Sequence, residues 1–225
     1  MHMRGEEMGK EKQVEKRSYN FEIRAEQDEK RGNIITGRPI VYNSRSDLGW
    51  FDEVIEPGAL NETDLTDVRF LVNHDTKMIP LARSRRNNGN STMMMSVDNQ
   101  GLNLDYVSLD TENNATARSL YSAIERGDLS GMSFMFSIDG ERWENLESDH
   151  PTRYIEKIGS VYEVSAVTWP AYDSTEINAR SKEALDNARL ALDKAKQQRE
   201  QPMDISLELE KRRLNSKEDK NNAKK

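Results

Sequence analysis

The stretch GDLSGMSFMFSI, residues 127–138, places the tightest constraint on the fold of this chain. From Met132 onward, every second residue is large and apolar, and serines occupy most of the positions between. That period of two is typical of a β-strand with one apolar face. Gly131 precedes the strand and gives the backbone freedom to turn. Ser133 therefore stands near the start of a strand, on the face opposite the phenylalanines.

A hydroxyl in that position is a nucleophile if a general base lies beside it. We expect Ser133 to face the surface, so that removal of its oxygen leaves the fold intact. A polar strand residue without a chemical role fits the same pattern, so this stretch alone does not decide the function. Ser130, before Gly131, is a competing nucleophile that lacks the alternating strand context.

A helix is predicted directly before this strand, over residues 111–126. Its apolar residues have the i, i+3, i+4, i+7 spacing of a helix that covers a core. They are Ala117, Leu120, Tyr121 and Ile124. Asn113 or Asn114 is suited to cap the start of the helix, and Gly127 is suited to end it.

Other short segments in the middle of the chain favour strands. They are residues 19–23, 33–43, 68–73, 93–97, 102–106, 154–158 and 161–169. The fourth and fifth segments form a hairpin in this interpretation, and Asp139-Gly140 is a hairpin-type turn. Gly37 and Pro39 indicate a bend like those at barrel corners. The sequence thus predicts a mostly β fold with a few helices, an α+β protein.

Charged and apolar residues are unevenly distributed over the 225 residues. Charged residues make up 32% of the chain, but the middle carries nearly all of the aromatic and β-branched residues. We therefore expect a flexible charged arm over residues 1–17 and a core over residues 18–180 that is large enough to bury apolar surface. Residues 181–225 are expected to form a charged tail, helical at first and then disordered.

The tail helix is predicted over residues 181–199. Its apolar seam has a and d spacing. The seam consists of Leu185, Ala188, Leu192 and Ala195. A helix with so thin a seam is marginal alone, so it either requires a partner or remains a solvated helix.

Composition disfavours several classes of function. The formal net charge is −7 and no basic patch is interleaved with aromatic residues, which argues against nucleic-acid binding. The chain has no cysteine, so it has neither a disulfide framework nor thiolate chemistry. It shows no apolar run of membrane-spanning length and no signal-peptide core. We expect neither a membrane nor a nucleic acid as partner, and a cytoplasmic location.

We expect no cofactor and no metal site. The chain has 3 histidines, no spacing such as HExxH and no glycine-rich phosphate loop. A hydrolase with paired carboxylates stays open, because 40 acidic residues offer many candidates. The remaining chemistry is a nucleophile with a base, for which serine is the strongest choice in this composition.

His74 and Glu163 are the candidate partners of Ser133. His74 ends an apolar segment, where a purely structural histidine is the commoner case. Glu163 lies in the run VYEVSAVTW, on the strand face that we assign to Val161 and Ser165. A carboxylate in such a run requires a partner, which an imidazole, an arginine or a water can provide. Chain order decides nothing, since triads are recognised by geometry.

Five segments together resemble one protein family. In chain order they read GNIITGRPIVYN, FDEVIEPGAL, VRFLVNHDTKMIPLAR, RGDLSGMSFMFSI and YEVSAVTWPAY. Their order and spacing are similar to those of the prohead proteases of tailed bacteriophages of the HK97 type. The resemblance covers residues 19–178, which is the whole of the expected core.

The resemblance implies a serine endopeptidase that works inside the assembling prohead in the host cytoplasm. Its implied substrates are the scaffold protein, or the scaffold-like segment of the major capsid protein precursor, and then the protease itself. A homo-oligomer, a dimer, is implied as well. The implied fold, shared with herpesvirus assembly proteases, is a small, mostly antiparallel β-barrel wrapped by helices. By motif, the resemblance assigns the base to His74, the nucleophile to Ser133 and the third position to Glu163.

Two departures from the family pattern leave questions open. Met135 stands where family members commonly have glycine, which puts the shape of the substrate groove in doubt. The herpesvirus relatives use a histidine as third member, so His150, in the polar loop SDHPT, competes with Glu163. The loop Arg83–Arg86 is a candidate for oxyanion contacts, and residues 132–138 offer an edge for an extended substrate. The alternative function is a capsid-assembly or scaffolding protein whose protease-like core no longer cuts.

Overall fold

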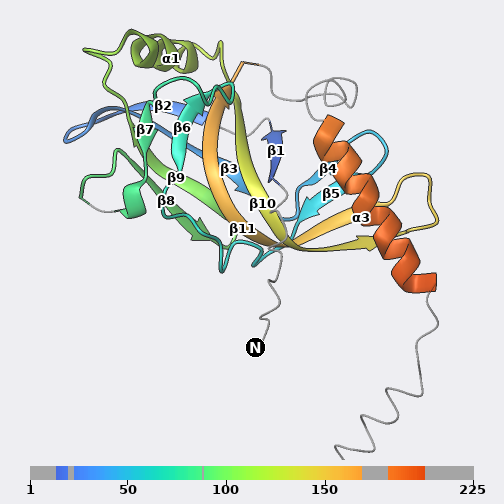
Figure 1. The fold of residues 1–225 in the computed structure, drawn as a ribbon. Coiled ribbons are helices and arrows are strands. Elements are labelled where there is room, and N and C mark those ends of the chain that lie inside the picture. The colour runs from blue at the N-terminus through green and yellow to red at the C-terminus, as the bar shows by residue number, and fades with distance from the viewer. Residues whose placement is uncertain (1–13, 20–22, 88, 169–181, 201–225) are drawn as a thin grey trace, which may run out of the picture.

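The computed structural model describes residues 14–19, 23–87, 89–168 and 182–200, and these form two β-sheets with helices beside them (Figure 1). The mostly β prediction is confirmed. The helices are α1 (Ala115–Glu125), a 3-10 turn η1 (Arg85–Asn87) and α3 (Lys182–Glu200). No helix among the described residues has both the length and the apolar character needed to cross a bilayer.

The larger sheet contains the serine strand and has the strand order β1-β10-β11-β5-β4, with β6 and β7 attached beside β11. Its strands are β1 (Val14–Tyr19), β4 (Arg45–Asp47), β5 (Asp52–Ile55), β6 (Arg69–Val72), β7 (Ala82–Arg83), β10 (Gly131–Glu144) and β11 (Thr152–Val167). Strands β5 and β6 pair in parallel with the two ends of β11, and β10 pairs with it in antiparallel. The long strand β11 thus joins the two halves of this sheet.

The smaller sheet is an antiparallel arrangement in the order β2-β3-β9-β8. Its strands are β2 (Ile23–Asp28), β3 (Gly32–Val41), β8 (Met93–Asp98) and β9 (Gly101–Ser108). The predicted hairpin over residues 93–106 is confirmed, since β8 and β9 pair across the turn at 99–100. One buried cluster contains Ile35 and Leu104 from this sheet, Phe134 and Val164 from the other, and Leu120 from α1. The two sheets and α1 therefore share one hydrophobic core.

The helix α1 begins and ends as its sequence predicts. The side chain of Asn114 accepts a hydrogen bond from the backbone N–H of Ala117, so it caps the first turn. At the other end, Gly127 has a φ of 77°, a left-handed conformation that glycine adopts without strain. The chain then enters β10 after a short connection, as the alternating pattern requires.

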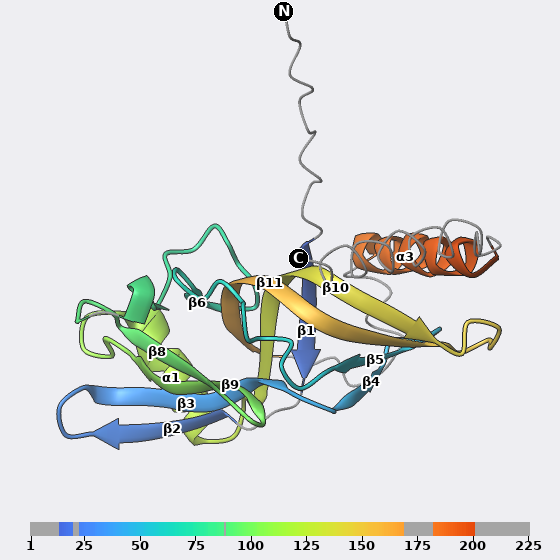
Figure 2. The ribbon, with the colours of Figure 1, turned by 90° about the horizontal axis from the view of Figure 1, so that it is seen from below.

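The expected closed barrel is not found in the described residues, because the larger sheet stays open. Two of its pairings are parallel, and its path ends at β1 on one side and β4 on the other. The sheet curls nevertheless, since β1 lies close to β4 and β5 in both ribbon views (Figures 1 and 2). Arg17 of β1 bonds Glu53 of β5 at 2.5 and 2.7 Å, although β10 and β11 separate these strands in the sheet order. Side-chain ion pairs thus bridge a gap that backbone hydrogen bonds leave open.

The turn predicted at Asp139-Gly140 is wrong. Strand β10 continues through these residues to Glu144, and the chain reverses only before β11 begins at Thr152. Register shifts on both sides of Gly140 show that the pairing absorbs the extra residue as a bulge. The turn residues therefore bend a long strand instead of ending it.

The first described residues form a strand of the larger sheet. Strand β1 begins at Val14, inside the stretch that we assigned to a flexible arm, while residues 1–13 lie outside the described residues. The predicted strand over 19–23 falls on the end of β1, the start of β2 and three residues outside the description. The disorder expected at the end of the tail, in residues 215–225, also lies outside the described residues.

Helix α3 finds its partner on the same chain. Leu185 and Ala188 are buried in a second cluster with Leu48 and Phe51, and Trp143 packs against it. The guanidinium of Arg189 lies 5.6 Å from the ring centre of Trp50, a cation–π distance. The thin seam predicted from sequence is therefore covered by the aromatic residues of β10 and of the β4–β5 hairpin.

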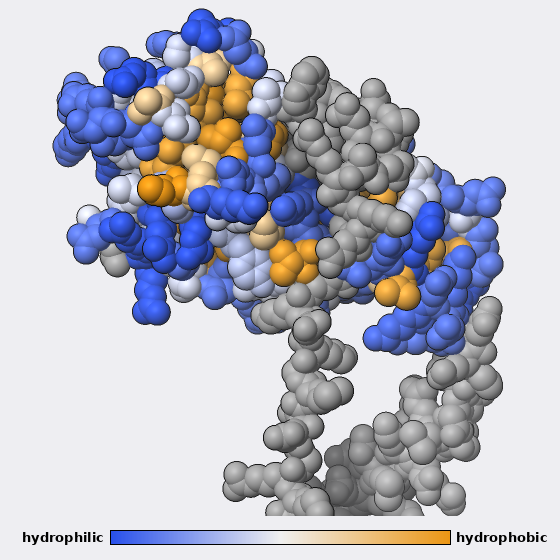
Figure 3. Space-filling view, turned by 45° about the horizontal axis from the view of Figure 1, so that its top comes forward, coloured by the Kyte–Doolittle hydropathy of each residue, from blue (hydrophilic) through white to orange (hydrophobic). Residues whose placement is uncertain are grey.

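The face drawn in Figure 3 is mainly hydrophilic where its residues are described. Polar residues there surround a limited apolar area. Among the described residues, the large apolar side chains that are exposed are Val14, Ile79, Val97 and Leu190. The other large apolar side chains whose burial the structure describes are buried or partly buried, as a shared core requires.

Gly101 tests the pairing of β3 with β9. Its φ is 139°, and a Cβ there would lie 2.0 Å from the carbonyl oxygen of Ile40. Because Gly101 pairs with Val41, the backbone has no room to move away. We expect Gly101→Ala to lower the free energy of unfolding by at least about 2 kcal/mol, measured by urea denaturation.

The matched control is Gly32→Ala. Gly32 also has a positive φ, 72°, but an added Cβ would meet no atom within 4 Å. Its expected cost is therefore only about 1 kcal/mol, from backbone strain. Equal losses for the two variants would contradict the close approach at Gly101.

Candidate active site

The structure brings together the three side chains that the sequence singles out. The Ser133 hydroxyl oxygen lies 2.5 Å from Nε2 of His74. The other ring nitrogen of His74, Nδ1, contacts the carboxylate oxygen Oε1 of Glu163. A continuous chain of polar contacts thus runs from the hydroxyl through the imidazole to the carboxylate.

Strand pairing sets the positions of the serine and the glutamate. In the β10–β11 ladder, Ser133 stands opposite Ser165 and Met135 stands opposite Glu163. Diagonal neighbours on one face of a sheet lie within reach of each other's side chains. Both carboxylate and hydroxyl therefore face the same side of the sheet, where the imidazole fits between them.

A bulge in β11 decides which way Glu163 points. Met135 pairs with Glu163 while Phe136 pairs with Val161, so Tyr162 is an extra residue on the β11 side. The bulge places Val161 in the hydrophobic core and Glu163 on the opposite face. The sequence interpretation that put both residues on one face is therefore wrong, because it assumed an unbroken period of two.

His74 is delivered by a tight turn at the end of β6. Both Asn73 and His74 have left-handed backbone conformations, with φ of 53° and 58°. Such a conformation costs about 1 kcal/mol or more for a residue other than glycine and occurs preferentially at functional sites. The Asn73 side chain bonds both the N–H and the hydroxyl of Thr168, which ties the turn to the end of β11.

Ser165 is a site residue that sequence reasoning did not single out. Its hydroxyl donates to Oε2 of Glu163 at 2.5 Å and accepts the backbone N–H of His74 at 3.1 Å. It is fully buried. The available signal was a second polar residue in the apolar run VSAV, two positions after Glu163. One hydroxyl thus holds the carboxylate and the histidine turn in a fixed relation.

Comparison with known proteins identifies the family of the chain. The sequence profile of the Caudovirus prohead serine proteases matches residues 19–189, which is well over half of the chain. The chain belongs to this family. It is therefore a serine protease, a hydrolase of peptide bonds, with a role in capsid maturation. No curated protein and no solved structure is similar to it at a significant level.

We expected Ser133 to face the surface, but in this prohead protease it is buried. Its exposed fraction is 0%. Strand β1 pairs along β10 with Ser18 opposite Ser133, and the serine hydroxyl lies 2.6 Å from the carbonyl oxygen of Arg17. The correction has a simple cause: the edge of β10 beside the serine is covered by a strand from the N-terminal part of the chain.

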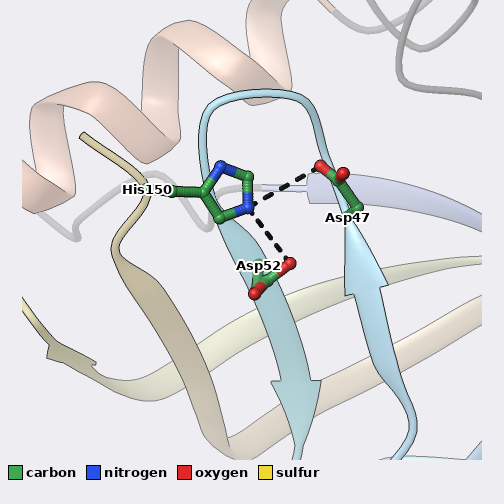
Figure 4. Close-up of side chains that lie close together, drawn as sticks. All are labelled: Asp47, Asp52 and His150. Carbon is green, nitrogen blue, oxygen red and sulfur yellow. Dashed lines mark hydrogen bonds and ion pairs between the residues drawn. The ribbon is translucent and has the colours of Figure 1, made fainter. Parts of the chain in front are cut away.

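The competing candidates lie elsewhere in the prohead protease. His150 is exposed and approaches Asp52 at 3.2 Å and Asp47 at 3.8 Å, on the β4–β5 hairpin (Figure 4). These three residues have ligand atoms within 4.8 Å of one another, but exposed acidic groups commonly lie so without a metal. Ser130 is exposed and precedes β10. The imidazole of His74 therefore contacts Glu163 and Ser133, not these candidates.

The loop Arg83–Arg86 forms hydrogen bonds with residues just before β6. Arg83 forms a two-pronged pair with the Asp67 carboxylate at 2.5 and 2.6 Å, and the N–H of Arg86 donates to the carbonyl of Thr66. The hydrogen bond from Arg83 lowers the pKa of Asp67 below its ordinary value. These contacts fix the loop, while the oxyanion role stays a prediction.

A buried charge cluster lies behind β1. Arg17, Glu53, Glu15 and Arg153 are each at most 6% exposed. Burial by itself would raise the pKa of Glu53, but the charge and hydrogen bonds of Arg17, followed by those of Arg153, lower it below its ordinary value. Arg153 also bonds the partly exposed Glu141 at 2.6 Å. Every buried charge therefore has a partner of opposite sign, which is the condition under which buried ions are tolerated.

Ser165→Ala tests whether this hydroxyl positions the prohead protease's Glu163 and His74. The variant removes one hydrogen bond from the carboxylate and leaves the His74 N–H without that acceptor. We expect kcat to fall about 10- to 100-fold with little change in KM, because Ser165 is fully buried and bonds Glu163 and His74. A peptide-cleavage assay checks the split, and Ser165→Thr, which keeps the hydroxyl, should recover part of the rate. Unchanged kcat in the alanine variant would contradict the positioning role.

Proposed function

We propose that this chain is a serine endopeptidase in which Ser133 is the nucleophile, His74 the general base and Glu163 the residue that orients the base. The observation that carries the proposal is the contact chain from Ser133 through His74 to Glu163. Three residues from different parts of the sequence meet there, with the spacing that nucleophilic catalysis requires. Family membership independently supports serine-protease chemistry.

The mechanism follows from where the protons can go. His74 Nε2 takes the proton of Ser133 as the oxygen attacks a peptide carbonyl carbon, and later gives it to the leaving amine. Glu163 bonds Nδ1, which fixes the tautomer with the free lone pair on Nε2 and stabilises the imidazolium. The second carboxylate oxygen is held by Ser165, so Glu163 keeps its orientation during the transfer.

We infer that the substrates are the scaffold protein or the scaffold-like segment of the capsid protein precursor, and the protease itself. The family's place in prohead maturation supports this substrate class. The edge of β10 beside Ser133 supports recognition of an extended segment, since it already accepts a strand in the structure. Recognition through backbone pairing suits a substrate that is unfolded around its cleavage site.

Ser133→Ala is the primary test. We expect cleavage of the coexpressed capsid precursor to fall by at least about 10⁴-fold, because no other group supplies the attacking oxygen. The products are followed by intact mass. Ser137→Ala is the matched control, since Ser137 is an equally buried serine on the same strand and face. Precursor that is still trimmed by the Ser133→Ala protein would overturn the assignment.

Glu163→Gln tests the third position. The amide keeps the shape but presents the wrong hydrogen-bonding partner to Nδ1, so we expect kcat to fall about 10³- to 10⁴-fold. Glu156→Gln, an exposed position on the same strand, should keep the normal rate. A near-normal rate for Glu163→Gln would remove Glu163 from the mechanism. A wild-type chain that binds the precursor without cutting it would favour the scaffolding function.

A further inference from the structure

Strand β1 occupies the place that an extended substrate would take. It pairs in antiparallel with β10 from Val14 opposite Ser137 to Tyr19 opposite Met132. On the other side β10 pairs with β11, so β1 fills the one remaining edge beside Ser133. A peptide that binds by adding a strand to this edge must displace β1 or be β1.

The backbone of Arg17 lies against the nucleophile. Its carbonyl oxygen is 2.6 Å from the Ser133 hydroxyl, which is itself 2.5 Å from Nε2 of His74. The serine proton thus has two acceptors in reach, the imidazole and this carbonyl. The peptide group between Arg17 and Ser18 is therefore the one presented to the triad.

The Arg17 side chain occupies a specific acidic site. Its Nε and one terminal nitrogen bond the two oxygens of Glu53 at 2.5 and 2.7 Å, and its guanidinium lies 5.8 Å from the ring centre of Phe136. Glu53 is itself 1% exposed. Paired hydrogen bonds of this kind select a guanidinium by shape as well as charge.

Glu15, two positions before Arg17, is also recognised through its charge. Both carboxylate oxygens of Glu15 lie 3.1 Å from Arg153. Lys16, which stands between Glu15 and Arg17 in the sequence, is exposed and points away from the cluster. A strand presents alternate residues to one face, so Glu15 and Arg17 enter the cluster together. The cluster is thus complementary to a three-residue pattern: an acidic residue, then any residue, then an arginine.

We propose that β1 is a substrate segment of its own chain: Ser133 cleaves the peptide bond between Arg17 and Ser18, and Glu53 selects the basic side chain before that bond. The proposal rests on the proposed function, because it requires the triad to cut. To the proposed function it adds the bond that is cut and the residue that specifies this bond. It also adds a substrate class, namely an extended segment with an arginine before the scissile bond. The family match begins at residue 19, one residue after Ser18.

The reaction is an acyl transfer followed by hydrolysis. The Ser133 oxygen bonds to the Arg17 carbonyl carbon while its proton passes to His74. The bond from that carbon to the Ser18 nitrogen breaks, and His74 gives the proton to this nitrogen. Ser18 therefore leaves with a neutral α-amino group. Water then attacks the ester, passes a proton through His74 back to the serine oxygen, and leaves Arg17 with a carboxylate. The products are residues 1–17 and 18–225.

The sequence Glu-Lys-Arg of residues 15–17 recurs at 29–31 and 210–212. The copy at 29–31 lies in the β2–β3 turn, where the N–H groups of Lys30 and Arg31 bond the Asp28 carboxylate. That turn cannot adopt the extended form seen in β1 without breaking the hairpin. Of the two copies that the structure describes, only the first is presented as a substrate strand.

The test uses the full chain, purified first as the Ser133→Ala variant and as the wild type. Intact mass and N-terminal sequencing should show residues 1–225 for the variant and a new terminus at Ser18 for the wild type. The cleavage rate should not depend on protein concentration, because the strand lies in the site of its own chain. A rate proportional to concentration would overturn cleavage of β1 by its own chain.

Variants at Arg17 test the selection. We expect Arg17→Gln to slow self-cleavage at least about 100-fold, since Glu53 then loses its bidentate partner. Arg17→Lys should retain intermediate activity through charge alone. Lys16→Gln is the matched control on the same strand and should cleave normally, because that side chain is exposed. Equal rates for Arg17→Gln and the wild type would overturn the role of Glu53.

Glu53→Gln provides a second measurement. Because it breaks a buried ion network, its fold is checked by circular dichroism, and its preference is read with peptides covering residues 12–21 that carry arginine or glutamine at position 17. The folded wild type should prefer arginine at least about 100-fold and the folded variant should lose most of that preference. If the variant does not fold, the peptide preference of the wild type alone decides, and no preference overturns the proposal.

The coexpressed capsid precursor separates this proposal from the function on which it rests. A wild-type chain that trims the precursor while keeping residues 1–17 would overturn cleavage at Arg17 and leave the protease assignment standing. A wild-type chain that cuts neither would overturn both. Release of residues 1–17 by the wild type and not by Ser133→Ala would support both.

Discussion

The pairing of β10 with β11 is the interaction on which the rest of the structure depends. It places Ser133 and Glu163 on one face, while the alternate residues Phe134 and Val164 enter the core on the other. On its other side, this part of β11 pairs with β6, and His74 follows the end of β6. The bulge at Tyr162 in this ladder turns Glu163 toward the face that carries Ser133. The contacts among Ser133, His74 and Glu163 and the packing of the core therefore depend on the same set of strand pairings.

The open edge of this sheet explains the buried charges. A closed barrel would pair its last strands through the backbone, whereas here Arg17 and Glu53 span the gap with side chains. Ions removed from water are costly unless they are paired and hydrogen-bonded. Each buried ion of the cluster has a hydrogen-bonded partner of opposite charge, so the cluster favours a segment with matching charges over an apolar one. The same cluster that holds β1 in place gives the site its charge preference.

Several elements could be predicted because their signals are local. Helix α1 has a stripe, an N-cap at Asn114 and a stop at Gly127, and the β8–β9 hairpin has alternation on both sides of a turn. The turn expected at Asp139-Gly140 failed because a bulge in a long strand has the same local chemistry as a hairpin turn. The burial of Ser133 could not be predicted either, since the strand that covers it comes from a charged segment with no apolar period.

The sequence by itself determined the strand of Ser133, the family, and three candidate residues, because alternation and motif order are properties of short segments. Only the tertiary structure decided that these three side chains touch, that Ser165 supports two of them, and that Glu163 and not His150 faces His74. The physical reason is that such contacts join residues 59 and 89 positions apart. Their distances depend on register, bulges and turns that no local pattern specifies.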